Sequence, residues 1–138
     1  DFSGSKVTIQ DTEFYNIHDK AISGGESSDI TVINLHIQNT GVGIASKDGT
    51  NVKGNHVKIV DYKMYALMTY IKKSFYNNST KLVIDDLEVE NTTNAYFRQE
   101  GSDLSVNGKI IKPQSLNVKT LYKSGVMKKW ILKKIDMK

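Results

Sequence analysis

The chain alternates apolar and polar residues in short stretches, and these stretches recur along its length. The clearest one begins at Ile30 and ends at Asn39, and related stretches end at Asn16, Asp61 and Asn91. The intervals are 39−16 = 23, 61−39 = 22 and 91−61 = 30 residues. Repeats of roughly 20 to 50 residues that contain short alternating strands are typical of stacked arrays. The pattern therefore predicts a parallel β-helix.

Each repeat is predicted to begin with two strands that bury one face. Alternation with a period of two residues places every second side chain on the buried side. The buried residues of the first strand are Val7 and Ile9, Ile30 and Val32, and Leu82 and Ile84; those of the second are Phe14, Leu35 and Ile37, Val57 and Ile59, and Leu87 and Val89.

Short polar residues mark two corners in each repeat. Such side chains tolerate left-handed backbone and can bond to their own backbone at a corner. On stacked coils they could also form hydrogen-bonded ladders. The predicted corner columns are Asp11, Asn34, His56 and Asp86, and then Asn16, Asn39, Asp61 and Asn91.

A third strand is predicted to follow the second corner, at residues 21–23, 44–46, 66–68 and 96–98. Its inward side chains are not determined, because neighbouring columns are both partly apolar and a shift of one residue would exchange the two faces. The turn after this strand varies most in length. Variable loops on one edge of a regular scaffold are where solenoids usually place binding residues.

The end of the chain departs from the repeat. A weaker strand at 104–106 meets Asn107-Gly108, which predicts a hairpin. Residues 1–114 are predicted to form the β-helix, and 115–138 a C-terminal capping segment of the same domain. Apolar residues from Val126 to Ile135 lie at roughly helical spacing with lysines between them, although a strand remains an alternative. A cap would shield open strand edges, whereas an amphipathic segment could touch an anionic surface.

Composition narrows the possible partners. The net charge is +4, but residues 119–138 hold seven lysines and one acid. A nucleic-acid binder would show a broader basic face with interleaved aromatics, so no nucleic-acid partner is predicted. No apolar run approaches the ~20 residues of a membrane span. The absence of cysteine excludes disulfides and fits a bacterial secreted or envelope protein. Because Asp1 is not an initiator methionine, we expect a mature form or part of a larger polypeptide.

The candidate site lies along the edge that follows the third strand. Equivalent positions on adjacent coils stack about 4.8 Å apart, which brings side chains of different repeats together. The predicted ligand-binding residues are Lys47, Asp48, Tyr70, Lys72, Lys73, Arg98 and Glu100. A cation beside a carboxylate and a tyrosine suits a lyase that acts on an acidic polysaccharide, because the cation stabilises the enolate and a base removes the α-proton. The catalytic candidates are Lys72, Arg98 and Tyr70.

Two other kinds of site are less favoured. Asp48 and Glu100 could serve glycoside hydrolysis, but they lie two coils apart, roughly 9.6 Å by the same spacing. That separation is at or beyond the upper limit for an inverting pair. The histidines His18, His36 and His56 fall at dissimilar positions in their repeats. No metal site and no cofactor are therefore predicted.

Four short segments resemble a known group of proteins. They are Asp19–Ser23, Gly25–Ser28, Gly43–Asp48 and Tyr70–Lys73. Similar segments occur in the right-handed parallel β-helix region of bacterial envelope proteins, as in the C-terminal part of spore-coat proteins of the CotH type, and the resemblance covers roughly residues 7–111. It implies a right-handed β-helix of the pectin-lyase-like fold, a fold that hosts lyases, hydrolases, epimerases and adhesins. The fold alone does not choose among these activities.

Together these observations predict an all-β, single-stranded, right-handed parallel β-helix of about four to five coils with a C-terminal cap. The leading functional hypothesis is a non-catalytic module of the cell surface, coat or envelope that binds glycan or mediates assembly within a larger bacterial protein. The alternative is a carbohydrate-modifying enzyme domain, either a polysaccharide lyase or a glycoside hydrolase.

Overall fold

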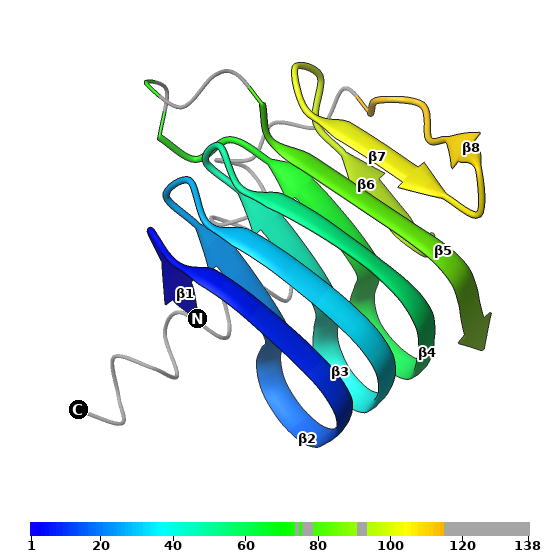
Figure 1. The fold of residues 1–138 in the computed structure, drawn as a ribbon. Helices are drawn as coiled ribbons and strands as arrows, with labels where there is room; N and C mark the ends of the chain where they lie inside the picture. The colour runs from blue at the N-terminus through cyan, green and yellow to red at the C-terminus, as the bar shows by residue number, and fades with distance from the viewer. Residues whose placement is uncertain (74, 76–78, 91–93, 115–138) are drawn as a thin grey trace, which may run out of the picture.

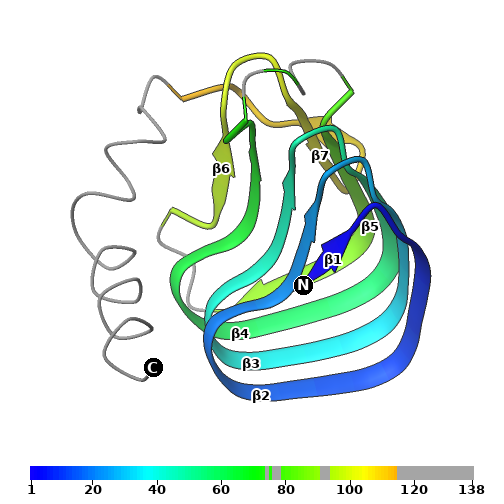
Figure 2. The ribbon, with the colours of Figure 1, turned by 90° about the vertical axis from the view of Figure 1, so that its left-hand side faces the viewer.

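The chain winds into a β-solenoid of about four turns in the computed structural model (Figure 1). The structure describes residues 1–73, 75, 79–90 and 94–114, which contain strands but no α-helix. Viewed along the axis, the chain runs clockwise from the N-terminal coil away from the viewer, so the coils are right-handed (Figure 2). The predicted fold class is confirmed. The strands are β1 (Phe2–Ser3), β2 (Lys6–Gly25), β3 (Asp29–Lys47), β4 (Asn51–Tyr70), β5 (Lys81–Glu90), β6 (Tyr96–Arg98), β7 (Asp103–Val106) and β8 (Lys109–Ile110).

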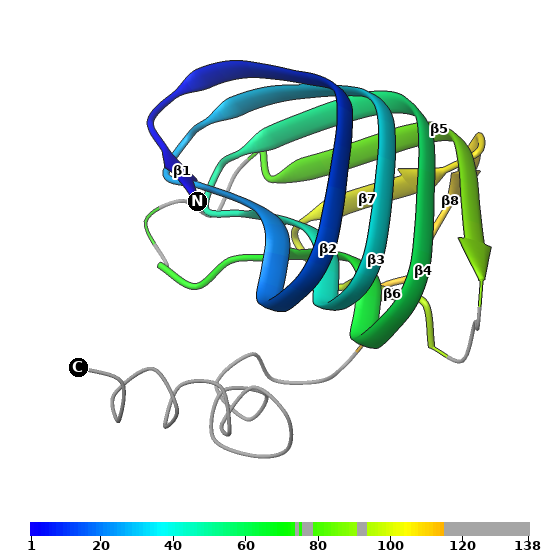
Figure 3. The same cartoon turned by 90° about the horizontal axis from the view of Figure 1, so that it is seen from below.

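Each complete coil is one long bent strand, where the sequence predicted three short ones. β2, β3, β4 and β5 lie side by side in parallel (Figure 3). Pairing continues past the first corner, since Gln10 pairs with Ile33 and Thr12 with Leu35. A single left-handed residue therefore turns the chain without ending the strand.

The two predicted corner columns are confirmed. Asp11, Asn34, His56 and Asp86 have φ between 50° and 59°, and Asn16, Asn39 and Asp61 between 57° and 58°; Asn91 lies outside the described residues. Ladder hydrogen bonds also form, from Asn34 Nδ2 to Asp11 Oδ1 at 2.8 Å and from Asn39 Nδ2 to Asn16 Oδ1 at 2.7 Å.

A third column of small hydroxyl residues lies just before the first strand of each coil. Its members are Ser5, Ser28, Thr50, Thr80 and Ser102, of which the last four are buried. The hydroxyls bond the turns to each other. The Ser28 hydroxyl accepts from the Ser5 amide at 3.2 Å, and the Thr80 hydroxyl accepts from the Gly49 amide at 2.8 Å. These bonds hold the edge that follows the third strand.

The third strand buries both of its faces. Ile22, Ile44 and Leu67 are paired neighbours that belong to the inner core, whereas Ala45 and Met68 belong to a second apolar cluster. The inward and outward positions of this strand are hard to read from the sequence, because the second coil is one residue shorter before it. Between the pairs Ile17–Thr40 and Lys20–Val42, the first coil advances by three residues and the second by two. The inward and the outward column of the third strand are both apolar, because both are buried.

The two ends of the solenoid differ. On its open side, the long edge of β2 pairs only with the two residues of β1 among the described residues. The core side chains of this first coil, such as Val7 and Phe14, are accordingly more exposed than Ile30 and Ile37. At the other end β7 and β8 form the predicted antiparallel hairpin around Asn107 and Gly108. The predicted capping segment, 115–138, lies outside the described residues.

Candidate functional site

A cleft of about 300 Å³ opens on the edge that follows the third strand, between the turns of the first three coils. We call it the turn-edge cleft. The turns reverse direction through left-handed residues, with φ of 54° at Glu26 and 53° at Asp48. The residues that line it are Asp1, Phe2, Ser3, Ser23, Gly25, Glu26, Lys47, Asp48, Lys72 and Lys73. Four of the seven predicted binding residues are therefore together: Lys47, Asp48, Lys72 and Lys73.

Asp48 holds the turn that carries the lysines. Its carboxylate is buried, and Oδ1 accepts from the backbone amides of Lys72 and Lys73, both at 2.8 Å. A carboxylate that receives two backbone N–H groups fixes the chain that donates them. The positions of Lys72 and Lys73 are thus set from the preceding coil.

Glu26 supplies one of the negative charges of the cleft, which Asp1 and Asp48 also line. Its carboxylate forms an ion pair with Lys73 and accepts from the Ser3 hydroxyl at 2.5 Å. The Lys73 ammonium, and then the Ser3 hydroxyl, hold the pKa of Glu26 below its ordinary value. The sequence pattern predicts that this turn lies on the candidate edge but does not single out Glu26, because nothing in the sequence pairs it with Lys73, 47 residues away.

The stem of Lys47 passes close to Gly25, in the turn of the preceding coil. A Cβ atom added to Gly25 would come within 3.0 Å of Lys47 Cε and 3.5 Å of Cγ. The glycine therefore leaves room for the apolar stem of the lysine, as long cationic side chains commonly lie along a surface with the charged end in water.

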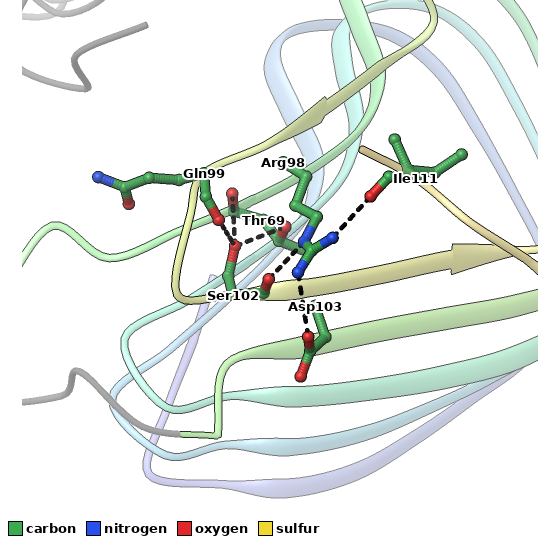
Figure 4. Close-up of polar contacts among 6 residues, drawn as sticks. All are labelled: Thr69, Arg98, Gln99, Ser102, Asp103 and Ile111. Carbon is green, nitrogen blue, oxygen red and sulfur yellow. Dashed lines mark hydrogen bonds and ion pairs between the residues drawn. The ribbon is translucent and has the colours of Figure 1, made fainter. Parts of the chain in front are cut away.

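The other three predicted residues lie elsewhere. Tyr70 is fully buried in the second apolar cluster. Glu100 is exposed on the turn after β6. Arg98 holds the C-terminal end of the solenoid together, as Figure 4 shows: its guanidinium donates to the carbonyls of Ser102 at 2.6 Å and Ile111 at 2.8 Å, and lies 3.4 Å from Asp103 Oδ1.

A larger groove, of about 570 Å³, runs along the first corner column. Asn34 and His56 bond to the carboxylates of Asp11 and Asp86, the latter at 2.8 Å from His56 Nδ1. Thr12, Glu13, His36, Lys58 and Glu88 complete its polar lining. The corner side chains bond to one another, which agrees with the structural role that the sequence predicted for them.

The described residues contain neither a metal centre nor a membrane-spanning helix. No group of three histidine, aspartate or glutamate side chains there is placed to hold a metal ion. The same residues include no helix with the length and apolar character that crossing a membrane requires.

Comparison of the chain with known protein families, curated proteins and solved structures finds no match.

Proposed function

We propose that this protein is a non-catalytic surface module that binds acidic polysaccharide in the turn-edge cleft. The observation that carries the proposal is the convergence of Lys47, Lys72 and Lys73 from the turns of two adjacent coils on one cleft. A row of ammonium groups on a regular scaffold matches a polymer that carries carboxylates along its length, and such charges favour both encounter and orientation.

Binding is favoured over catalysis because, of the three catalytic candidates, only Lys72 lines the cleft; Tyr70, Arg98 and the carboxylate of Asp48 have structural roles. Asp48 accepts two backbone amides, and Tyr70 is buried away from the cleft. Arg98 is bonded to two carbonyls near the C-terminal end. An α-proton abstraction needs its base within hydrogen-bond reach of the substrate, and neither Tyr70 nor Arg98 lines this cleft.

The proposal includes a location at the bacterial cell envelope or an extracellular coat. The resemblance to the β-helix region of bacterial envelope and CotH-type coat proteins supports it. The proposal also includes a partner at the open edge of β2, because another coil of a larger polypeptide could pair with that edge. Assembly through this edge would leave the turn-edge cleft on the side of the solenoid.

Calorimetric titration with a uronate-containing polysaccharide tests the proposal. Lys72→Ala and Lys47→Ala should each lower affinity by about two- to fivefold, as expected for one exposed charge contact of up to ~1 kcal/mol. Rising salt should weaken binding by the wild type. Lys53→Ala is the matched control, because Lys53 is an exposed lysine on β4 outside the cleft.

Ultraviolet absorbance of the unsaturated product, followed in the same mixtures, separates binding from lyase activity. Turnover that Lys72→Ala abolishes would overturn the non-catalytic proposal. Equal binding by all three variants would move the site away from the cleft. A total lack of binding to uronate polymers would leave the module with a purely structural role.

A further inference from the structure

The groove along the first corner differs from the turn-edge cleft in size and in charge. We call it the first-corner groove. Its volume of about 570 Å³ lies within the range of ligand-binding pockets. Its lining comes from four successive coils, which cover about 14 Å of the solenoid axis at the usual strand spacing. Most of its polar residues form two rows, the corner residues Asp11, Asn34, His56 and Asp86 and the outward residues Glu13, His36, Lys58 and Glu88.

The hydrogen-bonded ladder of the corner row is broken in its middle. Asn34 Nδ2 donates toward the first coil, to Asp11, whereas His56 Nδ1 bonds toward the fourth coil, to Asp86. Because the Asp86 carboxylate accepts, Nδ1 carries the proton, and Nε2 of the neutral ring is an acceptor. Both middle side chains are exposed. They leave Asn34 Oδ1 and His56 Nε2 as acceptors at the centre of the groove.

The donors of the lining already have acceptors within the protein. The Thr12 hydroxyl donates to the backbone carbonyl two residues earlier at 2.8 Å. His36 Nε2 lies 3.1 Å from Gln38 Oε1, which can only accept, so this ring nitrogen carries the proton. The Lys58 ammonium forms an ion pair with Glu90 at 3.4 Å. The groove is therefore poor in donors that a ligand could use.

Acceptors are in excess in the same lining. An ionised carboxylate only accepts, and the second nitrogen of a neutral imidazole also accepts. The carboxylates of the two rows are those of Asp11, Glu13, Asp86 and Glu88. Among the described lining residues they stand against the single ammonium group of Lys58. A ligand with several donors and no acidic group is therefore matched to the groove, and an anionic polymer is repelled.

An aromatic pair stands beside the groove on the outward face of the second strand. Glu13 pairs with His36, so Tyr15 is the diagonal neighbour of His36, and the two ring centroids lie 5.6 Å apart. Tyr15 is 47% exposed, which leaves part of its ring open to a ligand. A sugar ring has an apolar face of C–H groups and a rim of hydroxyl donors. It can pack on the tyrosine ring while its hydroxyls reach the acceptors.

We propose that the first-corner groove is a second carbohydrate site, which binds a sugar chain without acidic groups. The chain runs along the solenoid axis, and its hydroxyl groups donate to the two polar rows. The site is separate from the turn-edge cleft, because the two share no lining residue. Its selection is also opposite, since the lysines of the cleft attract carboxylates and the carboxylates of the groove repel them. The inference therefore does not depend on the proposed function.

Nuclear magnetic resonance of the backbone amides tests the proposal by locating the ligand. The probes are soluble oligomers of glucose and of N-acetylglucosamine, which are neutral, and of glucosamine, which carries amines. Any of the three should shift the amides of residues 11–15, 34–38, 56–58 and 86–88, and a larger effect of the glucosamine oligomer would show that the carboxylates bind its amines. If no oligomer shifts these amides, the proposal is overturned.

Two further probes test the chemistry of the ligand. Oligogalacturonate should leave the amides of the groove unshifted, because it is anionic. Binding of oligogalacturonate in the groove would overturn the selection by charge. Oligolysine supplies donors and positive charge without a sugar ring. If oligolysine shifts the amides of the groove and none of the sugar oligomers does, the ligand is a basic peptide and the carbohydrate site is overturned.

Substitutions on the outward row test the same site without touching a left-handed corner. His36→Ala, Glu88→Ala and Tyr15→Ala should each weaken the affinity for the sugar oligomer by about three- to tenfold, as expected for one lost contact. Asp85→Ala is the matched control, because Asp85 is an exposed acid of β5 outside the lining. Lys72→Ala should also leave this affinity unchanged, which separates the result from that for the turn-edge cleft. Equal affinities in all five variants would overturn the site.

Discussion

Two buried threonines show how the same hydroxyl can have opposite effects on stability. Thr80 Oγ1 accepts from the Gly49 amide at 2.8 Å. Thr40 Oγ1 is buried as well, but it has no hydrogen-bond partner among the described residues. A buried polar group without a partner costs its full desolvation, whereas a bonded one recovers that cost.

Thr80→Val should destabilise the fold, because it leaves the Gly49 amide without its acceptor. The expected loss in the free energy of unfolding is about 1–2 kcal/mol. Urea denaturation followed by circular dichroism measures it. An unchanged midpoint would show that the Ser and Thr column does not hold the turns.

Thr40→Val should leave stability unchanged or raise it by up to ~1 kcal/mol, since a methyl group replaces the unbonded hydroxyl at equal size. The same urea denaturation experiment measures the change in the free energy of unfolding, which should differ in sign or size from that of Thr80→Val. A loss as large as that of Thr80→Val would mean that Thr40 has a partner in solution.

Glu26→Gln should strengthen the binding of acidic polysaccharide by about two- to fivefold, because it removes the carboxylate that forms an ion pair with Lys73. Glu26 is partly exposed, so the effect on stability is small. The pKa of Glu26 is lower in the folded protein than in the unfolded chain. Its ionised carboxylate therefore stabilises the fold at pH values above the unfolded pKa. This stabilisation is lost as the pH falls through the lower pKa of the folded state. Weaker binding by Glu26→Gln would contradict Lys73 as a ligand.

Among the elements, the first and second strands and their corners follow from the sequence because each position repeats the same local requirement. A left-handed corner selects Asn, Asp or His, and a buried column selects branched apolar residues. The third strand does not follow in the same way. Its register shifts by one residue between coils, and its two apolar faces remove the alternation that would reveal the phase.

A glycine fills one place in the first-strand column where the other coils carry an apolar residue. Gly54 pairs with Val32 and Ile84. A Cβ atom there would lie 2.1 Å from Val32 Cγ2 and 2.6 Å from the Val32 carbonyl oxygen. The side chains of Val32 and Ile84 occupy the space that a Gly54 side chain would need, so the core is tightly packed only with glycine at this position.

Gly54→Ala should therefore lower stability by about 1–3 kcal/mol through overpacking, measured by denaturation. Gly25→Ala is the matched control, since the three atoms nearest to its added methyl all belong to the flexible stem of Lys47, and it should cost less. Equal losses in the two variants would attribute the effect to the backbone alone.

At the scale of the whole molecule, the sequence placed the lysines on one edge but could not assign the roles of their neighbours. Asp48 is a buried hydrogen-bond acceptor, and Tyr70 is a core residue. Arg98 links two segments of the chain near the C-terminal end of the solenoid through hydrogen bonds. Each role depends on burial or on a partner that is distant in the chain, as Ile111 is for Arg98. Repeat spacing carries neither kind of information.

The difference between the two ends of the solenoid also gives unfolding a direction. In a stacked array each coil is stabilised mainly by its neighbours, so loss can propagate one coil at a time. The hairpin of β7 and β8 and the bonds of Arg98 secure one end, while in the described part of the chain the outer edge of β2 pairs with β1 alone. Hydrogen exchange of the backbone amides should therefore be fastest in β2 and slower through β3 and β4, because the solenoid opens from its first coil.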